Sequence, residues 1–334
     1  MKYRHLPGTD LDLSEVGFGV WTVSTGWWGN IDEADGVRLL QEAVEQGVTL
    51  FDTADTYGEG YGEEILAKAL VNQRHNIVIG TKFGYDFHDS TPRVGHQERP
   101  QRFEPQFIRD ACEQSLRRLH TEYIDLYQLH NPRLDTIEKD EVFETLEDLV
   151  KEGKVRHYAT ALGPDIGWFE EGEASMRHRK VRAMQIIYSI LEQEPARRFF
   201  PIAEEEEIGL ISRVPHASEV LTNKYDQPPE FDPSDHRAHR KKEWLDQALK
   251  KANMVKFLAE DTGRTLAQSA IKFCLAQPSI VSILPNITGM EELTEYTSTS
   301  ETPALSSEEL EKLDDLWQEG FYLEEATTAV EGEG

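Results

Sequence analysis

The sequence predicts a (β/α)₈ barrel that carries an N-terminal β-hairpin and a C-terminal helical extension. Short apolar runs alternate with amphipathic helical patterns along the 334 residues and make up eight strand–helix units. Polar residues stand at or just past the ends of several runs, and these residues are Asp52, Tyr57, Lys82 and His130. A parallel barrel has its active site at the carboxyl ends of its strands, so both observations support the same fold.

The expected elements begin with a β-hairpin, in which residues 2–6 and 11–13 flank a turn at 7–10. Apolar runs then predict the barrel strands at 16–20, 48–51, 77–81, 124–129, 155–162, 183–189, 208–212 and 280–285. Apolar residues at helical spacing predict the main helices at 32–45, 63–70, 105–119, 142–150, 247–259 and 266–276. Pro105 is typical of the first position of a helix.

We interpret residues 1–320 as one domain, because no internal repeat and no linker divides them. The connection 214–236 contains four prolines and is longer than a simple loop, so we interpret it as a lid. For the basic run 236–242 we expect a solvated helix start, and a phosphate-binding role stays open because the run follows the seventh strand. The acidic segment 321–334 is predicted to be a flexible tail.

The chain is strongly acidic: 35 Lys and Arg residues face 62 Asp and Glu residues, which gives a formal net charge of −27. Nucleic acids and anionic membranes bind positive surfaces, so we exclude both as partners. The acids are spread along the whole chain, which favours a salt-adapted, halophilic surface over that of an ordinary acidic protein. The separate Cys112 and Cys274, and an N-terminus without a signal peptide, predict a cytoplasmic protein. We assign no residues to a metal.

The four strand-end residues form a set that can protonate a carbonyl oxygen. A phenol has a pKa of about 10 and is a poor acid at neutral pH, but a nearby ammonium lowers that pKa. We therefore expect Lys82 beside Tyr57, with Asp52 pairing with Lys82. His130 would then hydrogen-bond the carbonyl oxygen and orient it. This set moves protons but holds no electrons, so a bound cofactor must supply a hydride.

Each of the four residues also has a simpler interpretation when it is taken alone. Asp52 can cap a turn, and Tyr57 can be a packing aromatic. Lys82 can be a surface charge, and His130 can belong to the turn that follows its strand. All four residues on one face of one barrel are much harder to explain by chance, so we favour the catalytic interpretation.

Four stretches of the sequence resemble signatures of the aldo-keto reductase family, namely Gly47 to Gly58, Gly80 to Lys82, Tyr127 to His130 and Gly153 to Arg156. The resemblance covers nearly the whole chain, from the hairpin to Leu316. It implies a (β/α)₈ fold and nicotinamide-dependent reduction of carbonyls or oxidation of alcohols. It also implies a preference for NADP(H), with NAD(H) as the other cofactor, and a tetrad in which Tyr57 is the general acid–base.

The resemblance further implies a dinucleotide that lies extended across the barrel mouth without a Rossmann domain. On the family pattern, the cofactor contacts are assigned to Trp21, Asp52, Gln185, Arg213, Val214, Pro215, Asn286, Thr288 and Glu292. In that pattern Gln185 hydrogen-bonds the nicotinamide carboxamide.

The chain departs from the family pattern at several of these positions. Ala161 and Leu162 replace a Ser-Asn pair that would also hold the carboxamide, and Arg213 stands where a ring often stacks on the nicotinamide. Glu219 replaces a glycine. Thr288 holds the position of an arginine that would pair with a 2′-phosphate, which weakens the expected preference for NADP(H).

Trp21, Trp27 and Trp28 fall in the first loop on the expected active-site face, and with His130 they are the candidate substrate contacts. Aromatic walls suit sugars and ring ketones. We therefore favour an NAD(P)H-dependent oxidoreductase of aldehydes, ketones or sugars. The second interpretation is a dehydrogenase that mainly oxidises an aldose. A cofactor-binding sensor or accessory subunit with incidental turnover is the alternative from another class. The sequence leaves the oligomeric state open.

Overall fold

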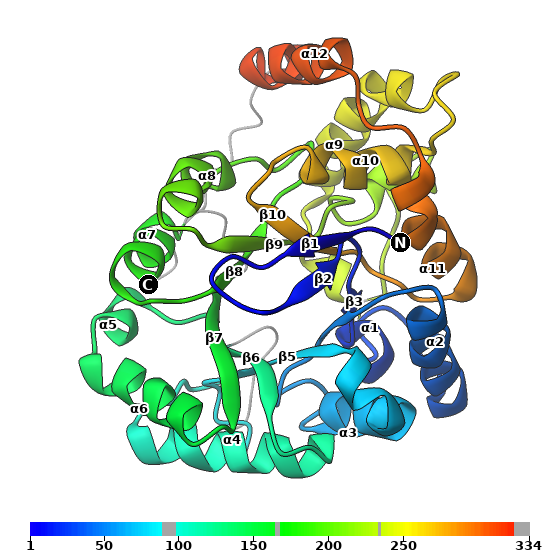
Figure 1. Ribbon diagram of the computed structural model, residues 1–334. Helices are drawn as coiled ribbons and strands as arrows, with labels where there is room; N and C mark the ends of the chain where they lie inside the picture. The colour runs from blue at the N-terminus through cyan, green and yellow to red at the C-terminus, as the bar shows by residue number, and fades with distance from the viewer. Residues whose placement is uncertain (89–97, 164–167, 233–234, 324–334) are drawn as a thin grey trace.

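Eight parallel strands form a barrel in the computed structural model, which describes residues 1–88, 98–163, 168–232 and 235–323 (Figure 1). Each strand pairs with the next along the chain, so the strand order follows the sequence order. The barrel strands are β3 (Phe18–Gly19), β4 (Leu50–Asp52), β5 (Val78–Phe83), β6 (Ile124–His130), β7 (Val155–Ala161), β8 (Ala183–Ile187), β9 (Gly209–Arg213) and β10 (Ile280–Leu284). The predicted (β/α)₈ fold is confirmed.

The first and last strands close the barrel through a short contact. Val16 and Ile283 form a parallel bridge, in which Gly17 N donates to Ile283 O at 2.8 Å and Ile283 N donates to Glu15 O at 3.0 Å. The first strand is shorter than expected, because regular pairing with β4 is limited to Phe18 and Gly19.

The parallel register brings the carboxyl ends of the strands to one mouth of the barrel. Asp52 at the end of β4 pairs with Gly80 of β5, and Lys82 of β5 pairs with Gln128 of β6. Residues two apart on one strand share a face, so Gly80 and Lys82 point to the same side of β5. This register places the polar strand ends of the sequence next to one another.

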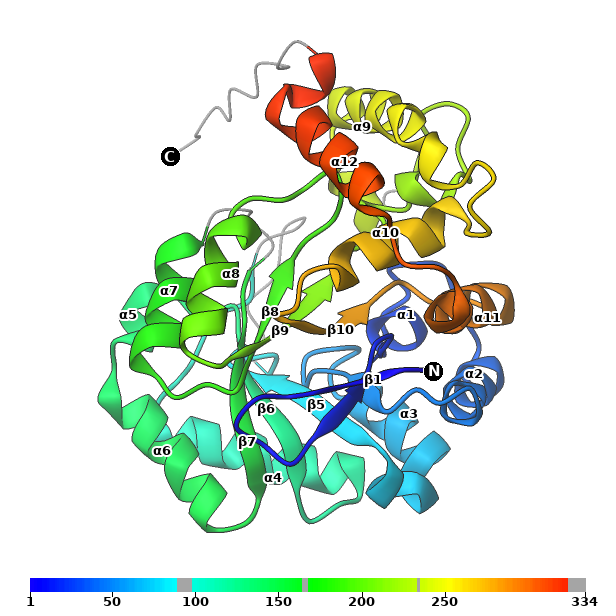
Figure 2. The same cartoon turned by 45° about the horizontal axis from the view of Figure 1, so that its top comes forward.

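Helices surround the barrel on its outer side (Figures 1 and 2). Their apolar faces pack on the strands; in α4, for example, Pro105 begins the helix and Ile108, Cys112 and Leu119 are buried. The helices are α1 (Trp21–Ser24), α2 (Glu33–Glu45), α3 (Tyr61–Leu70), α4 (Pro105–Leu119), α5 (Leu134–Ile137), α6 (Asp140–Lys151), α7 (Phe169–His178), α8 (Ala196–Glu205), α9 (Lys242–Met254), α10 (Leu266–Leu275), α11 (Met290–Thr297) and α12 (Ser307–Gln318). Among the described residues, no helix is long and apolar enough to cross a membrane.

The N-terminal hairpin plugs the end of the barrel that lies opposite the polar strand ends. Strands β1 (Tyr3–His5) and β2 (Asp12–Ser14) pair in antiparallel fashion, and Leu6, Leu11 and Leu13 are buried. These leucines share one hydrophobic cluster with a residue from each of seven barrel strands, namely Leu50, Val78, Leu126, Ala159, Ala183, Ile211 and Val281. The plug leaves the other mouth as the open end.

The C-terminal extension is tied to the barrel before and after α12, which lies outside the barrel near α9 and α10 (Figure 2). Arg264 donates to Ala304 O at 2.8 Å and pairs with Glu309. Phe321, which the sequence placed in the tail, is buried against the core. The packed extension therefore reaches beyond residue 320, and residues 324–334 of the expected tail lie outside the described residues.

Helix α9 begins and ends five residues earlier than the predicted helix 247–259. Its first turn contains Lys242 and Glu243, and the apolar periodicity used for the prediction starts only after this turn. A separate 3₁₀ turn, Lys256–Leu258, follows α9 and accounts for the predicted C-terminal end.

Candidate active site

Lys82 joins the members of the predicted tetrad at the open mouth of the barrel. Its ammonium pairs with Asp52 Oδ1 and donates to Thr53 O at 2.8 Å and to the Tyr57 hydroxyl at 3.3 Å. Asp52 ends β4, Lys82 lies in β5, and Tyr57 stands in the loop after β4. The structure therefore brings together an acid, an ammonium and a phenol as the sequence predicted.

Tyr57 and Lys82 are both buried. For each of them, burial shifts the pKa in one direction and the charge of the principal neighbour shifts it in the other. Burial raises the pKa of the Tyr57 phenol, and the Lys82 ammonium opposes this rise without cancelling it. Burial disfavours the charged form of Lys82, yet Asp52 and Tyr57 together raise its pKa. The expectation of a net lowering of the Tyr57 pKa is therefore wrong for the protein without ligands, because burial outweighs the ammonium.

His130 is the last residue of β6, and its ring lies close to the ring of Tyr57. The two ring centroids lie 6.0 Å apart with nearly perpendicular planes, and the Tyr85 ring lies 4.9 Å from His130. Burial, together with the charges of Lys82 and Arg213, lowers the pKa of His130 well below its usual value. The imidazole is thus neutral at physiological pH and acts as a hydrogen-bonding group rather than a cation.

A cavity of about 590 Å³ opens above the tetrad. It is within the size range of small-molecule sites. Seven of the residues that the sequence assigned to cofactor or substrate line it beside the tetrad, namely Trp21, Trp27, Trp28, Gln185, Arg213, Val214 and Asn286. Pro215, Thr288 and Glu292 do not line this cavity, and Asp52 lies beneath it behind Lys82.

Two tryptophans of the first loop enclose the Tyr57 ring. Trp21 and Trp27 meet it edge to face, with centroids 6.3 and 6.2 Å away. The Trp21 indole donates to Asn286 Oδ1 at 2.9 Å, which joins the first loop to the loop after β10. The Tyr57 ring therefore has an aromatic neighbour on two sides.

Comparisons with known proteins identify the family of this chain. A model of the Aldo/keto reductase family matches residues 15–318. The chain belongs to the aldo/keto reductase family. A curated relative, the "Uncharacterized oxidoreductase YqkF" of Bacillus subtilis, is 31% identical over 328 residues and covers 96% of this chain and 98% of its own. The protein is therefore an oxidoreductase.

Solved aldo/keto reductase structures share the whole fold. The holo form of the aldo-keto reductase AKR11C1 from Bacillus halodurans has a TM-score of 0.77 and 27% identity, over 95% of this chain and 96% of that one. The glycerol dehydrogenase AKR11B4 from Gluconobacter oxydans has a TM-score of 0.79 and 26% identity, over 95% of each chain.

Arg213 contacts the end of β7, where this aldo/keto reductase has Ala161 and Leu162 in place of the Ser-Asn pair of the family pattern. One guanidinium nitrogen, Nη2, donates to Leu162 O at 2.9 Å and to Gly163 O at 3.1 Å. Arg213, Ala161 and Leu162 all line the cavity. Arg213 thus adds a positive charge to the wall on which the missing polar side chains would stand.

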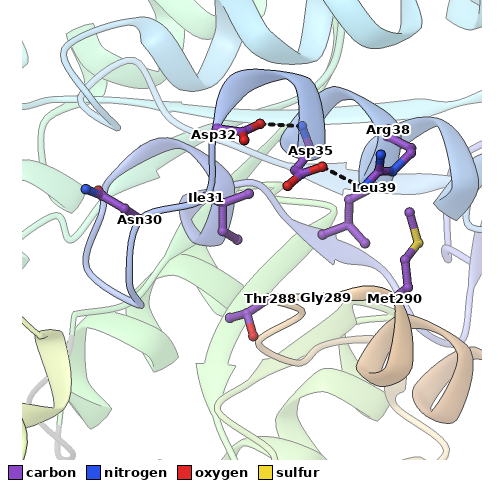
Figure 3. A pocket seen from close by; sticks show the side chains of 9 residues that line it. All are labelled: Asn30, Ile31, Asp32, Asp35, Arg38, Leu39, Thr288, Gly289 and Met290. Atoms are coloured by element: carbon purple, nitrogen blue, oxygen red, sulfur yellow. Dashed lines mark hydrogen bonds and ion pairs between the residues drawn. The ribbon is translucent and has the colours of Figure 1, made fainter.

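The connection from β10 to α11 borders a second cavity of about 660 Å³, shown in Figure 3. Thr288 and Met290 lie on one side of it, and Asp32, Asp35 and Arg38 of the α2 region on the other. Arg38 pairs with Asp35 at 2.5 Å. The polar wall of this cavity therefore contains two carboxylates and a single, already paired, cation.

Thr288 is engaged by a carboxylate instead of offering free donors. Its N and Oγ1 donate to Glu292 Oε2 at 2.6 and 2.7 Å, and the other oxygen of Glu292 pairs with Lys224. Burial would raise the pKa of Glu292, but Lys224 and Thr288 hold it below its usual value. Glu292 is therefore ionised at neutral pH, and its negative charge lies beside Thr288, the position at which the family pattern has an arginine.

The basic run 236–242 ends in the solvated helix start that we expected, since Lys241 and Lys242 are exposed and Lys242 begins α9, but its first part is folded against the protein. It contains a 3₁₀ turn, His236–His239, and its two arginines point into the protein. Arg237 pairs with Glu219 at 2.8 Å and lies 4.9 Å from the Trp28 ring. Arg240 pairs with Glu192 at 2.9 Å. These acidic partners from other segments explain why the two arginines are only partly exposed.

The sequence interpretation missed the residues that form the outer part of the active-site cavity. Tyr85, Glu98, Arg99 and Asn131 all line it. Asn131 Nδ2 donates to the Tyr85 hydroxyl at 2.8 Å, and this hydroxyl donates to Glu98. Two of these residues carried a signal, since Tyr85 lies two residues after the end of β5 and Asn131 directly follows the end of β6.

Proposed function

We propose that this protein transfers a hydride between a nicotinamide dinucleotide and a carbonyl or alcohol, with Tyr57 as the general acid–base. It would reduce aldehydes and ketones, or oxidise the corresponding alcohols or aldoses. One observation carries the proposal: Lys82 contacts both Asp52 and Tyr57 at the base of a cavity large enough for a small molecule. Membership of an oxidoreductase family supports it.

In the reductive direction Tyr57 gives its proton to the carbonyl oxygen as negative charge builds there. Lys82 stabilises the phenolate that remains, because its ammonium lies 3.3 Å from the phenol oxygen. Asp52 keeps Lys82 protonated and directed toward Tyr57. The neutral His130 holds the substrate oxygen beside the phenol. Oxidation uses the same groups in reverse, with Tyr57 accepting the proton of the alcohol.

The cavity fits a nicotinamide ring together with a small substrate. A bound dinucleotide would supply or accept the hydride. Gln185, Asn286 and Arg213 line the cavity, so these residues would hold the nicotinamide end. The solved relative AKR11C1 is described as a holo form, which supports a bound cofactor in this family.

Sugars and other polyols are a specific substrate class to test within this proposal. Tryptophan rings form one wall, and polar groups of Glu98, Arg99 and Asn131 form the rim. Such walls suit a molecule with an apolar face and several hydroxyls. The similarity to a glycerol dehydrogenase supports the oxidative direction as a second arm of the test.

The test is a screen of the purified protein against aldehydes, ketones, aldoses and polyols. Absorbance of the reduced nicotinamide is followed with NADPH and NADH for reduction, and with the oxidised cofactors for oxidation. We expect turnover on at least one class and loss of that turnover in Tyr57→Phe. Tight cofactor binding without turnover on any class would instead support the sensor or accessory role.

A further inference from the structure

Gln128 reaches across a neighbouring strand to the buried carboxylate of the tetrad. It lies on β6, two residues before His130, and its Nε2 donates to Asp52 Oδ2 on β4 at 2.8 Å. Strand β5 lies between β4 and β6, so the side chain spans the full width of that strand. Both side chains are about 1% exposed, so the contact is shielded from water.

Gly80 of β5 provides the space for this contact. A Cβ atom at residue 80 would lie 3.0 Å from Gln128 Nε2 and 3.3 Å from Asp52 Oδ2. Gly80 is not among the glycines with positive φ, so its backbone does not require a glycine. The glycine therefore serves the hydrogen bond that passes over it.

Each oxygen of Asp52 has its own donors. Oδ1 receives Lys82, while Oδ2 receives both Gln128 and Gln185. An ionised carboxylate can only accept, so the amide nitrogens must face it. Gln185 Nε2 also donates to Gln128 Oε1 at 2.9 Å, which fixes the Gln128 amide at both ends. The carboxylate is thus held in one orientation, with Oδ1 toward Lys82.

We propose that Gln128 is a positioning residue that acts through Asp52 and Lys82 to set how readily Tyr57 exchanges its proton, with Gly80 as the residue that makes its reach possible. The inference rests on the proposed function and adds a residue to it. The amide hydrogen offsets part of the Asp52 charge, which otherwise opposes ionisation of Tyr57. Without Gln128, more of that negative charge acts on Lys82 and Tyr57.

The first variant is Gln128→Leu, which keeps a similar volume but removes the donor. A buried hydrogen bond to a charged group is worth enough to change kcat by about tenfold or more. We expect that loss in kcat, KM within about twofold of the wild type, and a basic limb of the pH profile at higher pH, because the Tyr57 pKa rises. Unchanged cofactor affinity would show that the binding site is intact.

A measurement on the protein without cofactor separates this inference from the proposed function. Carbon-13 NMR of labelled tyrosine reports ionisation at the Tyr57 Cζ, and Tyr57→Phe identifies the signal. In Gln128→Leu the titration should move to higher pH whether or not a substrate is known. If Tyr57→Phe left turnover unchanged, the proposed function would fail, but this titration would still decide the role of Gln128.

Two further variants keep the inference testable if Gln128→Leu does not fold. In Gln128→Glu a protonated carboxyl can replace the amide donor, so activity relative to the wild type should be near normal at low pH and fall as pH rises. Gly80→Ala should push Gln128 away and shift the Tyr57 titration in the same direction as Gln128→Leu. The double variant Gly80→Ala/Gln128→Leu should then lose no more activity than the less active of the two single variants.

Gln268→Leu is the matched control, since Gln268 is a buried glutamine of α10 that donates to Glu295 O and Ser298 Oγ away from the cavity. Gln268→Leu should lower the melting temperature without changing the pH profile of kcat. If Gln128→Leu likewise changed only the melting temperature, with the pH profile and the Tyr57 titration unmoved, Gln128 would be a structural residue and the inference would be overturned.

Discussion

Lys82 is the residue on which the chemistry of the site depends, because it contacts both the carboxylate and the phenol. Burial raises the pKa of Tyr57 in the protein without ligands. A proton therefore stays on the phenol at neutral pH until charge develops on a substrate oxygen. The neutral His130 adds no competing positive charge beside it. The resting site is thus set to donate a proton.

Removal of the phenol hydroxyl tests this role directly. Tyr57→Phe should lower kcat by about 10²–10⁴-fold, which is the usual contribution of a general acid. Cofactor affinity should change little, because the hydroxyl acts on the substrate oxygen. Tyr123→Phe is a suitable control, since Tyr123 precedes β6 at the opposite end of the barrel. A Tyr57→Phe enzyme with most of the wild-type turnover would exclude the assignment.

We expect Arg213 to affect the binding of the dinucleotide more than the rate of the hydride-transfer step. Arg213 lines the cavity, and its Nη2 donates to the carbonyls of Leu162 and Gly163. Arg213→Ala should weaken dinucleotide binding about tenfold or more, because a charge-assisted contact is lost. Fluorescence titration measures this change. Arg177→Ala on the outer helix α7 is the control, and equal affinities in all three proteins would remove Arg213 from the cofactor site.

At the scale of elements, the loops after β9 and β10 depart most from the family pattern. After β9, Val214, Ser218 and Glu219 have positive φ, which is uncommon for residues other than glycine. Glu219 is held there by its ion pair with Arg237, which also lies against Trp28 of the first loop. This connection therefore contacts the loop that carries the tryptophans lining the cavity. Its role as a lid stays a prediction.

The loop after β10 predicts an unusual cofactor preference. NADP(H) should be used, but its advantage over NAD(H) in kcat/KM should be small, because Glu292 occupies the donors of Thr288. Thr288→Arg should raise the ratio of NADP(H) to NAD(H) about tenfold through a charged contact with the 2′-phosphate. Thr294→Arg on the outer side of α11 is the control for added charge. A large NADP(H) preference in the wild type would mean that another base, such as Lys224, binds the phosphate.

At the scale of the whole molecule, acids outnumber the bases that could neutralise them. Single bases are shared by several acids, as Arg177 is by Glu173, Glu205 and Glu206, and Lys154 by Glu113 and Glu152. The net charge of −27 is therefore left on the surface of one compact barrel. Repulsion among these charges opposes folding unless ions screen it.

Stability should consequently depend on salt. Molar potassium chloride shortens the screening length to about 3 Å, which removes most of the repulsion. We expect the melting midpoint to rise with salt, and a gain of about 4 kcal/mol would appear as a rise of roughly 6 °C. Sucrose at matched osmolality is the control for a general solvent effect. A midpoint that stays flat from dilute buffer to molar salt would contradict the salt-adapted surface.

The sequence by itself was enough to predict the barrel, because strand and helix periods are local properties and parallel strands collect their carboxyl ends on one face. It also predicted the tetrad, since Asp52, Lys82 and His130 each mark the end of a strand. The same strand-end rule would have found Tyr85 and Asn131.

Only the tertiary structure decided which polar groups partner one another. Gln128 bonds Asp52 over a gap of 76 residues, and Arg237 pairs with Glu219 in a loop whose course no local pattern predicts. The hydroxyl of Thr288 donates a hydrogen bond to Glu292 and is not free for another acceptor. Whether two groups form a hydrogen bond or an ion pair depends on differences of a few tenths of an ångström in the distance between them. The packing of elements that lie far apart in the chain sets that distance.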